Sequence, residues 1–150
     1  MSKGFTQPYL KLYMMRKIKI ILMATIILMM MPTMAYSQTN KWECVMNAII
    51  AVESDGNAKA VSKDCVGAMQ IRPVLVQDVN EYLKIKGKKK RFTLKDRLNI
   101  KKSKEMFVLY QERYNPTGNI EKAIRLWNGG CGYSVAKTEK YYRKVLSCMK

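Results

Sequence analysis

Three short polar segments interrupt the apolar stretches of this chain, and their residue types suit work on a carbohydrate. They are Glu53-Ser54, residues 67–73 (GAMQIRP) and residues 126–130 (LWNGG). A carboxyl group in an apolar pocket stays protonated closer to neutral pH and can act as a general acid. Amide side chains bridge hydroxyl and N-acetyl groups, and an indole stacks on a sugar face. The three segments therefore predict a glycan site with Glu53 as its acid.

The absence of histidine from all 150 residues narrows the chemistry further. It excludes Ser-His-Asp and Cys-His mechanisms, and it excludes a metal held by histidine. A zinc site made of cysteines is disfavoured because the sequence contains no Cys-x-x-Cys pair. We therefore expect no metal and no cofactor, and a reaction that depends on carboxylates, amides and hydroxyls.

A helix predicted over residues 41–53 must position Glu53. Its apolar residues recur at helical spacing, namely Trp42, Val45, Met46, Ile49, Ile50 and Val52. The helix-breaking residues 54–57 (SDGN) follow, so Glu53 falls at the C-terminal end of the helix. A carboxylate is disfavoured at the negative end of a helix dipole, and we expect this placement to raise its pKa.

The remainder of the chain has mostly helical periodicity, which predicts a mainly α or α+β domain of short helices packed around a cleft. An irregular loop with a strand or turn is expected over residues 58–72, and an exposed basic loop over 84–91. Four further helices are expected, over residues 73–84, from Thr93 to about Tyr114, over 119–127 and over 134–147.

Residues 14–37 have the pattern of a secretory signal peptide. A basic start (residues 14–19) precedes an apolar run (20–31), Pro32 and a small-x-small cleavage site at residues 35–37. An uncleaved membrane anchor is the alternative, although the run is shorter than the roughly 20 residues of a spanning helix. We expect residues 1–37 to be an N-terminal extension and signal peptide, with translation starting at Met1, Met14 or Met15. Residues 38–150 form the domain, exported to the periplasm or cell envelope or secreted.

The domain is strongly basic and contains an even number of cysteines. Residues 38–150 hold 23 Lys and Arg against 11 Asp and Glu, a net charge near +12. This charge implies an anionic partner such as the cell wall, a membrane surface or nucleic acid, or simply a solvated basic face. Four cysteines in a small exported domain indicate two disulfides. Of three possible pairings we expect Cys44–Cys148, which would join the terminal helices, together with Cys65–Cys131.

The ordered motifs resemble those of the soluble lytic transglycosylases. Glu53-Ser54, Ala60-Val61-Ser62 and residues 67–73 are similar to the E-S, A-x-S and G-L-M-Q-I-x-P motifs of that family. The segment 126–130 is similar to A-Y-N-x-G, and Thr138 to Val145 resembles the closing T-x-x-Y pattern, with Asn99-Ile100 matching the N-I before the third motif. Four motifs in the same order, across residues 43–146, make the resemblance specific. Two substitutions depart from it, Ala68 for leucine and Trp127 for tyrosine, and the gap from Glu53 to Gln70 is about one residue short.

The resemblance implies a lysozyme-like fold that cleaves the β-1,4 bond between N-acetylmuramic acid and N-acetylglucosamine. Glu53 would protonate the leaving oxygen and then act as base while the muramyl C6 hydroxyl closes a 1,6-anhydro ring. Peptidoglycan strands are the implied partner, in the setting of a secretion or conjugation apparatus or of phage lysis. The protein would contact the membrane only through its signal segment, if that segment is not cleaved. We expect no binding to a specific nucleic acid.

Each further site residue has a binding interpretation and a structural one. Ser54 and Asn128 either contact the substrate or hold their turns, and Gln70 either binds an N-acetyl group, orients Glu53 or satisfies its loop. Met69 and Trp127 either pack against a sugar or belong to the core, and Tyr141 either approaches Glu53 or packs in the core. A lysozyme-type hydrolase, with Asp55 or Asp64 as second carboxylate, is the nearest alternative. A non-catalytic peptidoglycan-binding module and a secreted nucleic-acid binder are the others.

Overall fold

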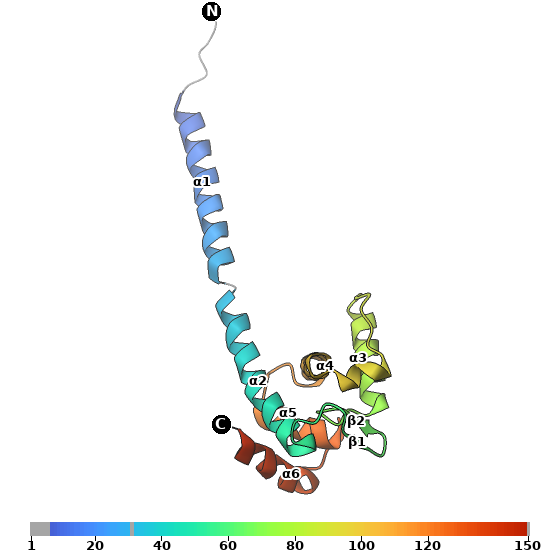
Figure 1. The fold of residues 1–150 in the computed structure, drawn as a ribbon. Coiled ribbons are helices and arrows are strands. Elements are labelled where there is room, and N and C mark those ends of the chain that lie inside the picture. The colour runs from blue at the N-terminus through green and yellow to red at the C-terminus, as the bar shows by residue number, and fades with distance from the viewer. Residues whose placement is uncertain (1–6, 31, 150) are drawn as a thin grey trace, which may run out of the picture. The chain divides into compact units, whose positions relative to one another are not determined.

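The computed structural model describes residues 7–30 and 32–149, with side chains for residues 12–23 and 41–149 (Figure 1). Residues 1–6 of the predicted extension, and Met31 at the end of the predicted apolar run, lie outside the described residues. The chain divides into two units, residues 1–40 and 41–150. In the first, helix α1 spans Gln7–Met30 and α2 (Pro32–Ser54) begins at the proline that was expected to end the apolar run. Within the described segments, no helix is both long enough and apolar enough to cross a bilayer.

The second half of α2 supplies one wall of the core of residues 41–150. Trp42, Val45, Met46 and Ile49 are buried at the helical spacing predicted from the sequence. The helix ends at Ser54, where Asp55 and Gly56 both adopt positive φ. Glu53 is therefore the penultimate residue of a helix whose apolar face anchors it to the core.

A short antiparallel hairpin follows, made of β1 (Val61–Ser62) and β2 (Cys65–Val66). A bridge between Val66 and Ile71 turns the chain back on itself, so that residues 67–70 form a tight loop. The irregular segment with a strand or turn that the sequence predicts here is this hairpin and loop. Helix α3 (Pro73–Ile85) starts immediately afterwards, with its proline at the first helical position.

The helix expected from Thr93 to Tyr114 is in fact two elements. A 3-10 helix, η1 (Leu94–Leu98), begins with a capping box in which Thr93 and Asp96 exchange hydrogen bonds. Asn99 is extended, and its side chain accepts a hydrogen bond from the backbone N–H of Lys102 to start α4 (Ile100–Tyr114). The prediction of one continuous helix was wrong because two N-terminal caps lie only six residues apart. Asn99-Ile100 does open a helix, as the motif comparison implied.

The last two helices, α5 (Ile120–Gly129) and α6 (Val135–Cys148), pack against each other, and α3 packs against α4. Phe107 of α4 is fully buried at the centre, with its ring 5.1 Å from that of Trp127 on α5 and 5.7 Å from that of Trp42 on α2. These ring contacts connect the helix that carries Glu53 to the two helices behind the site. The mainly helical fold with a small two-stranded sheet is the one expected from the sequence.

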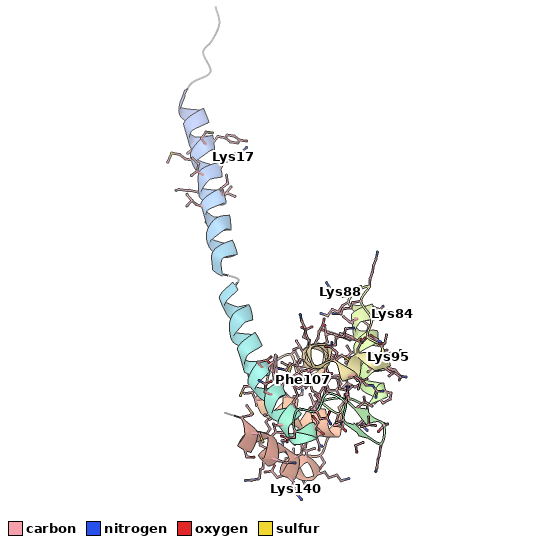
Figure 2. The ribbon with its side chains drawn as sticks, viewed as in Figure 1. Lys17, Lys84, Lys88, Lys95, Phe107 and Lys140 are labelled. Carbon is pink, nitrogen blue, oxygen red and sulfur yellow. The ribbon has the colours of Figure 1, made fainter. Side chains whose placement is uncertain are left out.

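The lysines that make the domain basic lie at its surface. Figure 2 shows Lys84, Lys88 and Lys95 pointing outward around α3 and the loop after it, with Phe107 enclosed among the helices. Residues 84–91 are all exposed, and the loop follows the end of α3 as predicted. This arrangement keeps the cationic run away from the core.

Candidate active site

Glu53 is a half-buried carboxyl group held at the end of α2. Burial is the main cause that raises its pKa above the ordinary value, because a charged carboxylate loses hydration there. A hydrogen bond from Tyr141 and the positive charge of Lys144 act in the opposite direction without cancelling the effect. The net result is an acid that retains its proton to a higher pH than an exposed glutamate.

Tyr141, on α6, holds this carboxyl group. Its hydroxyl donates a hydrogen bond of 2.7 Å to Glu53 Oε1. Burial raises the pKa of Tyr141, and so do the negative charge of Glu53 and the hydrogen bond to it. Tyr141 therefore keeps its proton to a higher pH than an exposed tyrosine does and remains a donor near neutral pH. Its two predicted places are combined in the structure, since the hydroxyl lies beside Glu53 and the side chain also packs against the core.

Glu53 lines a cavity of about 200 Å³. Its walls come from α2, the hairpin, the loop after the hairpin and α5. The residues that line it are Glu53, Ser62, Cys65, Gln70, Arg72, Trp127 and Asn128. Four residues singled out from the sequence thus meet at one place: Glu53, Gln70, Trp127 and Asn128. Ser54, Met69 and Tyr141 do not line the cavity, and each contributes through another residue.

Ser54 and Met69 connect the elements that form the cavity walls. The Ser54 hydroxyl donates 2.8 Å to the carbonyl of Ala68, which ties the end of α2 to the loop 67–70. Met69 is fully buried in the core, and its carbonyl accepts 3.2 Å from the indole N–H of Trp127. These contacts keep the carboxyl group, the loop and the indole at fixed positions relative to one another.

Gln70 stands in the left-handed region, with φ of 48°, and its side chain spans its own loop. The amide nitrogen donates 2.9 Å to the carbonyl of Gly67 and 3.3 Å to that of Ala60. Its carbonyl oxygen accepts no hydrogen bond from any residue in the described part of the chain. Gln70 thus combines the loop-satisfying role with an acceptor that is available to a ligand in the cavity.

Gly67 and Arg97 fix the loop at its other side. A Cβ atom on Gly67 would lie 1.8 Å from the carbonyl oxygen of Arg97, and the φ of Gly67 is 84°. The Arg97 guanidinium, which is buried, donates to the carbonyls of Asp64 and Ile71 at 3.0 Å each. A single arginine from η1 therefore braces the turn of the hairpin and the end of the loop that leads to α3. Sequence reasoning missed Arg97 because it lies in a basic, apparently exposed stretch.

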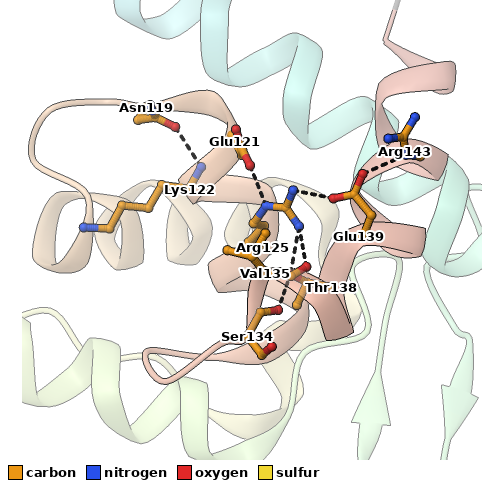
Figure 3. A network of polar contacts seen from close by, with 9 residues as sticks. All are labelled: Asn119, Glu121, Lys122, Arg125, Ser134, Val135, Thr138, Glu139 and Arg143. Carbon is orange, nitrogen blue, oxygen red and sulfur yellow. Dashed lines mark hydrogen bonds and ion pairs between the residues drawn. The ribbon is translucent and has the colours of Figure 1, made fainter.

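A network around Arg125 joins α5 to α6, as Figure 3 shows. The guanidinium binds Glu121 at 2.8 Å and Glu139 at 2.7 Å, and it also donates to Thr138 and to the carbonyl of Val135. The α5 helix carries Trp127 and Asn128, and α6 carries Tyr141. The network therefore sets the position of Tyr141 relative to the cavity, and it accounts for the threonine of the T-x-x-Y pattern.

Three residues in the wall of the Glu53 cavity were not predicted from the sequence: Ser62, Cys65 and Arg72. Ser62 was quoted only as part of the A-x-S motif, and Arg72 occupies the variable position before Pro73. The motif itself was the available signal for both. A second cavity, of about 210 Å³, adjoins the first and shares Gln70, Arg72 and Trp127 with it.

The predicted disulfides are not present in the structure. Cys65, Cys131 and Cys148 have free thiols, so neither Cys44–Cys148 nor Cys65–Cys131 is formed. Cys65 lines the Glu53 cavity, and Cys131 lines the adjoining one. Burial raises the pKa of the Cys65 thiol, and the neighbouring charge of Asp64 adds to this effect. The predicted pairing was based on the even number of cysteines and on their positions in the sequence. Neither of these determines which thiols come close together in the fold.

Comparison with known proteins places the chain in a family. The family model described as "Transglycosylase SLT domain" matches residues 30–144, so the chain belongs to that family. No curated protein and no solved structure matches it. Membership indicates an enzyme of the lytic transglycosylase type that acts on peptidoglycan in the periplasm or cell envelope. The mostly helical fold with a small sheet agrees with this assignment.

Proposed function

We propose that this protein cleaves the β-1,4 bond between N-acetylmuramic acid and N-acetylglucosamine, with Glu53 acting first as acid and then as base. The observation that carries the proposal is the state of Glu53. It is a half-buried carboxyl group with a raised pKa, it faces a cavity, and Tyr141 is its hydrogen-bonding partner. A general acid needs a proton at working pH and a path to the leaving oxygen; the raised pKa favours the first and the position in the cavity wall favours the second.

In the first step, protonated Glu53 gives its proton to the glycosidic oxygen as the bond to the muramyl anomeric carbon breaks. The carboxylate that remains is stabilised by the Tyr141 hydroxyl, which already donates to Oε1. In the second step, the C6 hydroxyl of the same muramyl residue attacks the anomeric carbon, and Glu53 takes up its proton. Glu53 ends as it began, and the products are a free 4-hydroxyl and a 1,6-anhydro ring.

Three cavity residues provide contacts for the sugar. The free carbonyl oxygen of Gln70 can accept from an amide N–H or a hydroxyl, and the exposed amide of Asn128, which lines the same cavity, can bind a further polar group of the sugar. Trp127 presents part of its indole to the cavity while the rest packs on Phe107. These are the residue types that neutral N-acetyl sugars require.

The distribution of carboxylates supports the lyase over a hydrolase. Glycosidases that use water or a covalent intermediate need a second carboxylate across the bond. Of the residues that line the Glu53 cavity, Glu53 alone is acidic. Asp55 and Asp64 are exposed and outside that lining, and Asp78 of the adjoining cavity is bound by Arg113. A nucleophile carried by the substrate removes the need for a second carboxylate.

Export of the domain is part of the same proposal, because peptidoglycan lies outside the cytoplasmic membrane. The signal-peptide pattern of residues 14–37 supports it, with cleavage after Ser37. The N-terminus of the protein recovered from the cell envelope would establish the site of cleavage.

The test is mass spectrometry of muropeptides released from purified sacculi by the protein and by Glu53→Gln. We expect products with 1,6-anhydro-muramyl ends from the wild type and none from the variant. Reducing ends instead would make the protein a lysozyme-type hydrolase. Binding to sacculi without any release would make it a peptidoglycan-binding module.

A further inference from the structure

The second cavity lies beside the catalytic one and has a different character. It is about 210 Å³ in volume, and its lining combines the charged Arg72 and Asp78 with the apolar Val74, Leu75 and Leu126. Gln70, Arg72 and Trp127 line both cavities, so the two are contiguous along one face of the loop and α5. A ligand cleaved at Glu53 therefore has room to extend into the second cavity.

Arg72 is the charged group at the junction of the two cavities. Of the six arginines within residues 41–149, Arg72 alone has no hydrogen-bond or ion-pair partner for its guanidinium; Arg91, Arg97, Arg113, Arg125 and Arg143 are all bonded. The charge of Arg72 reaches the thiol of Cys65 in the cavity wall. It lowers the pKa of that thiol, although burial has the larger effect and raises it. An arginine that lines two cavities and has no protein partner is available to an anionic ligand.

The one acidic residue in the lining of the second cavity does not offset this charge. Asp78 pairs with Arg113 at 2.9 Å and accepts 2.8 Å from the Tyr114 hydroxyl. Glu53, the acid of the first cavity, has a raised pKa and so carries less negative charge near neutrality than an exposed glutamate. The junction consequently has a net positive potential, in a domain that is itself basic.

We propose that the second cavity is a subsite for the peptide stem of the glycan strand and that Arg72 binds a carboxylate of that stem. In a strand with intact stems the lactyl carboxyl group of each muramyl residue is tied up as an amide, so the sugars give a guanidinium no counter-charge, whereas the stem peptides bear carboxylates on a chain of small and apolar groups. The cavity matches this combination, with Arg72 at one end and Val74, Leu75 and Leu126 in its walls. The planar fork of arginine suits a carboxylate with two parallel hydrogen bonds. The subsite rests on the proposed function, because it is defined by its position beside Glu53.

The experiment compares two substrates with the full chain. One is a preparation of glycan strands with intact peptide stems, and the other is the same preparation with the stem carboxylates converted to methyl amides. The readout is the ratio of kcat/KM for the free over the amidated strands. We expect a ratio of about ten for the wild type, the size of a charge-assisted hydrogen-bonded contact, and a ratio near one for Arg72→Ala.

Two further variants make the comparison specific. Arg72→Lys keeps the charge but loses the fork and should give an intermediate ratio. Lys101→Ala removes an exposed cation of α4 that lines neither cavity and should keep the wild-type ratio. Thermal unfolding of Arg72→Ala should match that of the wild type, because Arg72 is exposed and caps α3 only through its backbone.

The outcomes separate the subsite from the reaction. A ratio near one for the wild type, or an equal ratio for wild type and Arg72→Ala, would overturn the assignment. A tenfold effect of Arg72→Ala on peptide-free strands would instead assign Arg72 to the lactyl carboxylate of the sugar and also overturn it. If the wild type cleaves neither preparation, the proposed function fails. The dissociation constants of a soluble disaccharide-peptide and its amidated form, with and without Arg72, then decide the subsite alone.

Discussion

The hydroxyl of Tyr141 lies 2.7 Å from Oε1 of Glu53, although 88 positions separate the two residues in the sequence. The contact joins α2 to α6, the helices at the two ends of the domain. It directly restrains the carboxyl group that we propose to be catalytic, and it depends on the packing of α5 against α6. The chemistry at Glu53 is therefore sensitive to the position of the last helix.

Tyr141→Phe should change the pH dependence of glycan cleavage in a defined direction. The hydroxyl donates to the carboxylate and so lowers the pKa of Glu53, and its loss should raise that pKa further. Since Glu53 must be protonated in the first step of the proposed mechanism, the alkaline limb of kcat/KM should move to higher pH. The rate itself should fall by about tenfold or more, because the carboxylate formed in the first step loses a charge-assisted hydrogen bond.

Lys144→Ala serves as the matched variant for this measurement. The Lys144 charge also lowers the pKa of Glu53, so its removal should move the limb in the same direction. The difference between this variant and the wild type should shrink at high salt, because it reflects an interaction across solvent. A limb that moves to lower pH in Tyr141→Phe would show that Tyr141 does not donate to the Glu53 carboxylate during the reaction.

Glu53→Gln should stabilise the fold at neutral pH. The folded-state pKa of Glu53 is raised, so the folded protein holds the proton more tightly than the unfolded chain. That contribution to stability is fully present below the unfolded pKa and is lost as pH rises through the folded pKa. Glutamine does not ionise, and its carbonyl can still accept from Tyr141. We expect a Tm about 2 to 4 °C above that of the wild type at pH 7.

The pH dependence of this variant serves as its control. Below the pKa of glutamate in the unfolded chain, the wild-type side chain is protonated in both the folded and the unfolded state, so the Tm difference should disappear. Scanning calorimetry across this range measures the difference directly. A constant difference at all pH values would attribute the gain to packing and not to the ionisation of Glu53.

The sequence predicts helix ends best where an apolar helical pattern meets a helix-breaking or helix-starting residue. The apolar spacing of residues 41–53 and the helix-breaking residues 54–57 predict the end of α2, and Pro73 and residues 128–130 mark the start of α3 and the end of α5. The order of the motifs also predicts that Glu53, Gln70 and Asn128 belong to one site, and these residues line one cavity. Local propensity and motif spacing both depend on near neighbours in the chain, which a sequence records directly.

The features that escaped prediction depend on contacts between distant segments. Arg97 is buried where its guanidinium donates to the carbonyls of Asp64 and Ile71 and to that of Leu94 in its own 3-10 helix, and no periodicity marks such a position. Arg72 lies at the junction of two cavities only because α3 leaves the loop at that point. The break at Asn99 did have a local signal, a second capping residue six positions after Thr93, and it was outweighed by the apolar pattern that continues across it.

Arg125→Met should destabilise the domain and lower activity together. The Arg125 side chain is 3 % exposed and bonds Glu121, Glu139 and Thr138, so the variant leaves several polar groups without their partner. We expect Tm to fall by about 5 °C or more. Arg143→Ala, which removes the other partner of Glu139 at a side chain that is 78 % exposed, should change Tm very little. Equal effects of the two variants would contradict a special role of Arg125 in joining α5 to α6.

Gly67→Ala should damage both the fold and the site. The new methyl group would lie 1.8 Å from the Arg97 carbonyl oxygen, and the residue would also have to keep a φ of 84°. The left-handed conformation costs an alanine about 1 to 2 kcal/mol, and relief of the clash requires the loop to move away from η1. We expect a loss of roughly 3 kcal/mol or more in the free energy of unfolding by urea, since overpacking against backbone adds about 1 to 3 kcal/mol.

Gly56→Ala separates the two causes because Gly56 has the same φ of 84° and no atom within 4 Å of the added Cβ. It should cost only the conformational part, about 1 to 2 kcal/mol. The difference between the variants then measures the close approach of Gly67 to Arg97. Movement of the loop displaces Gln70, whose amide nitrogen donates to the Gly67 carbonyl, so Gly67→Ala should also lose glycan cleavage under conditions where it is still folded. Equal stability and activity in the two variants would mean that the loop can move away from Arg97 freely, and that the glycine of this motif is needed for its backbone conformation alone.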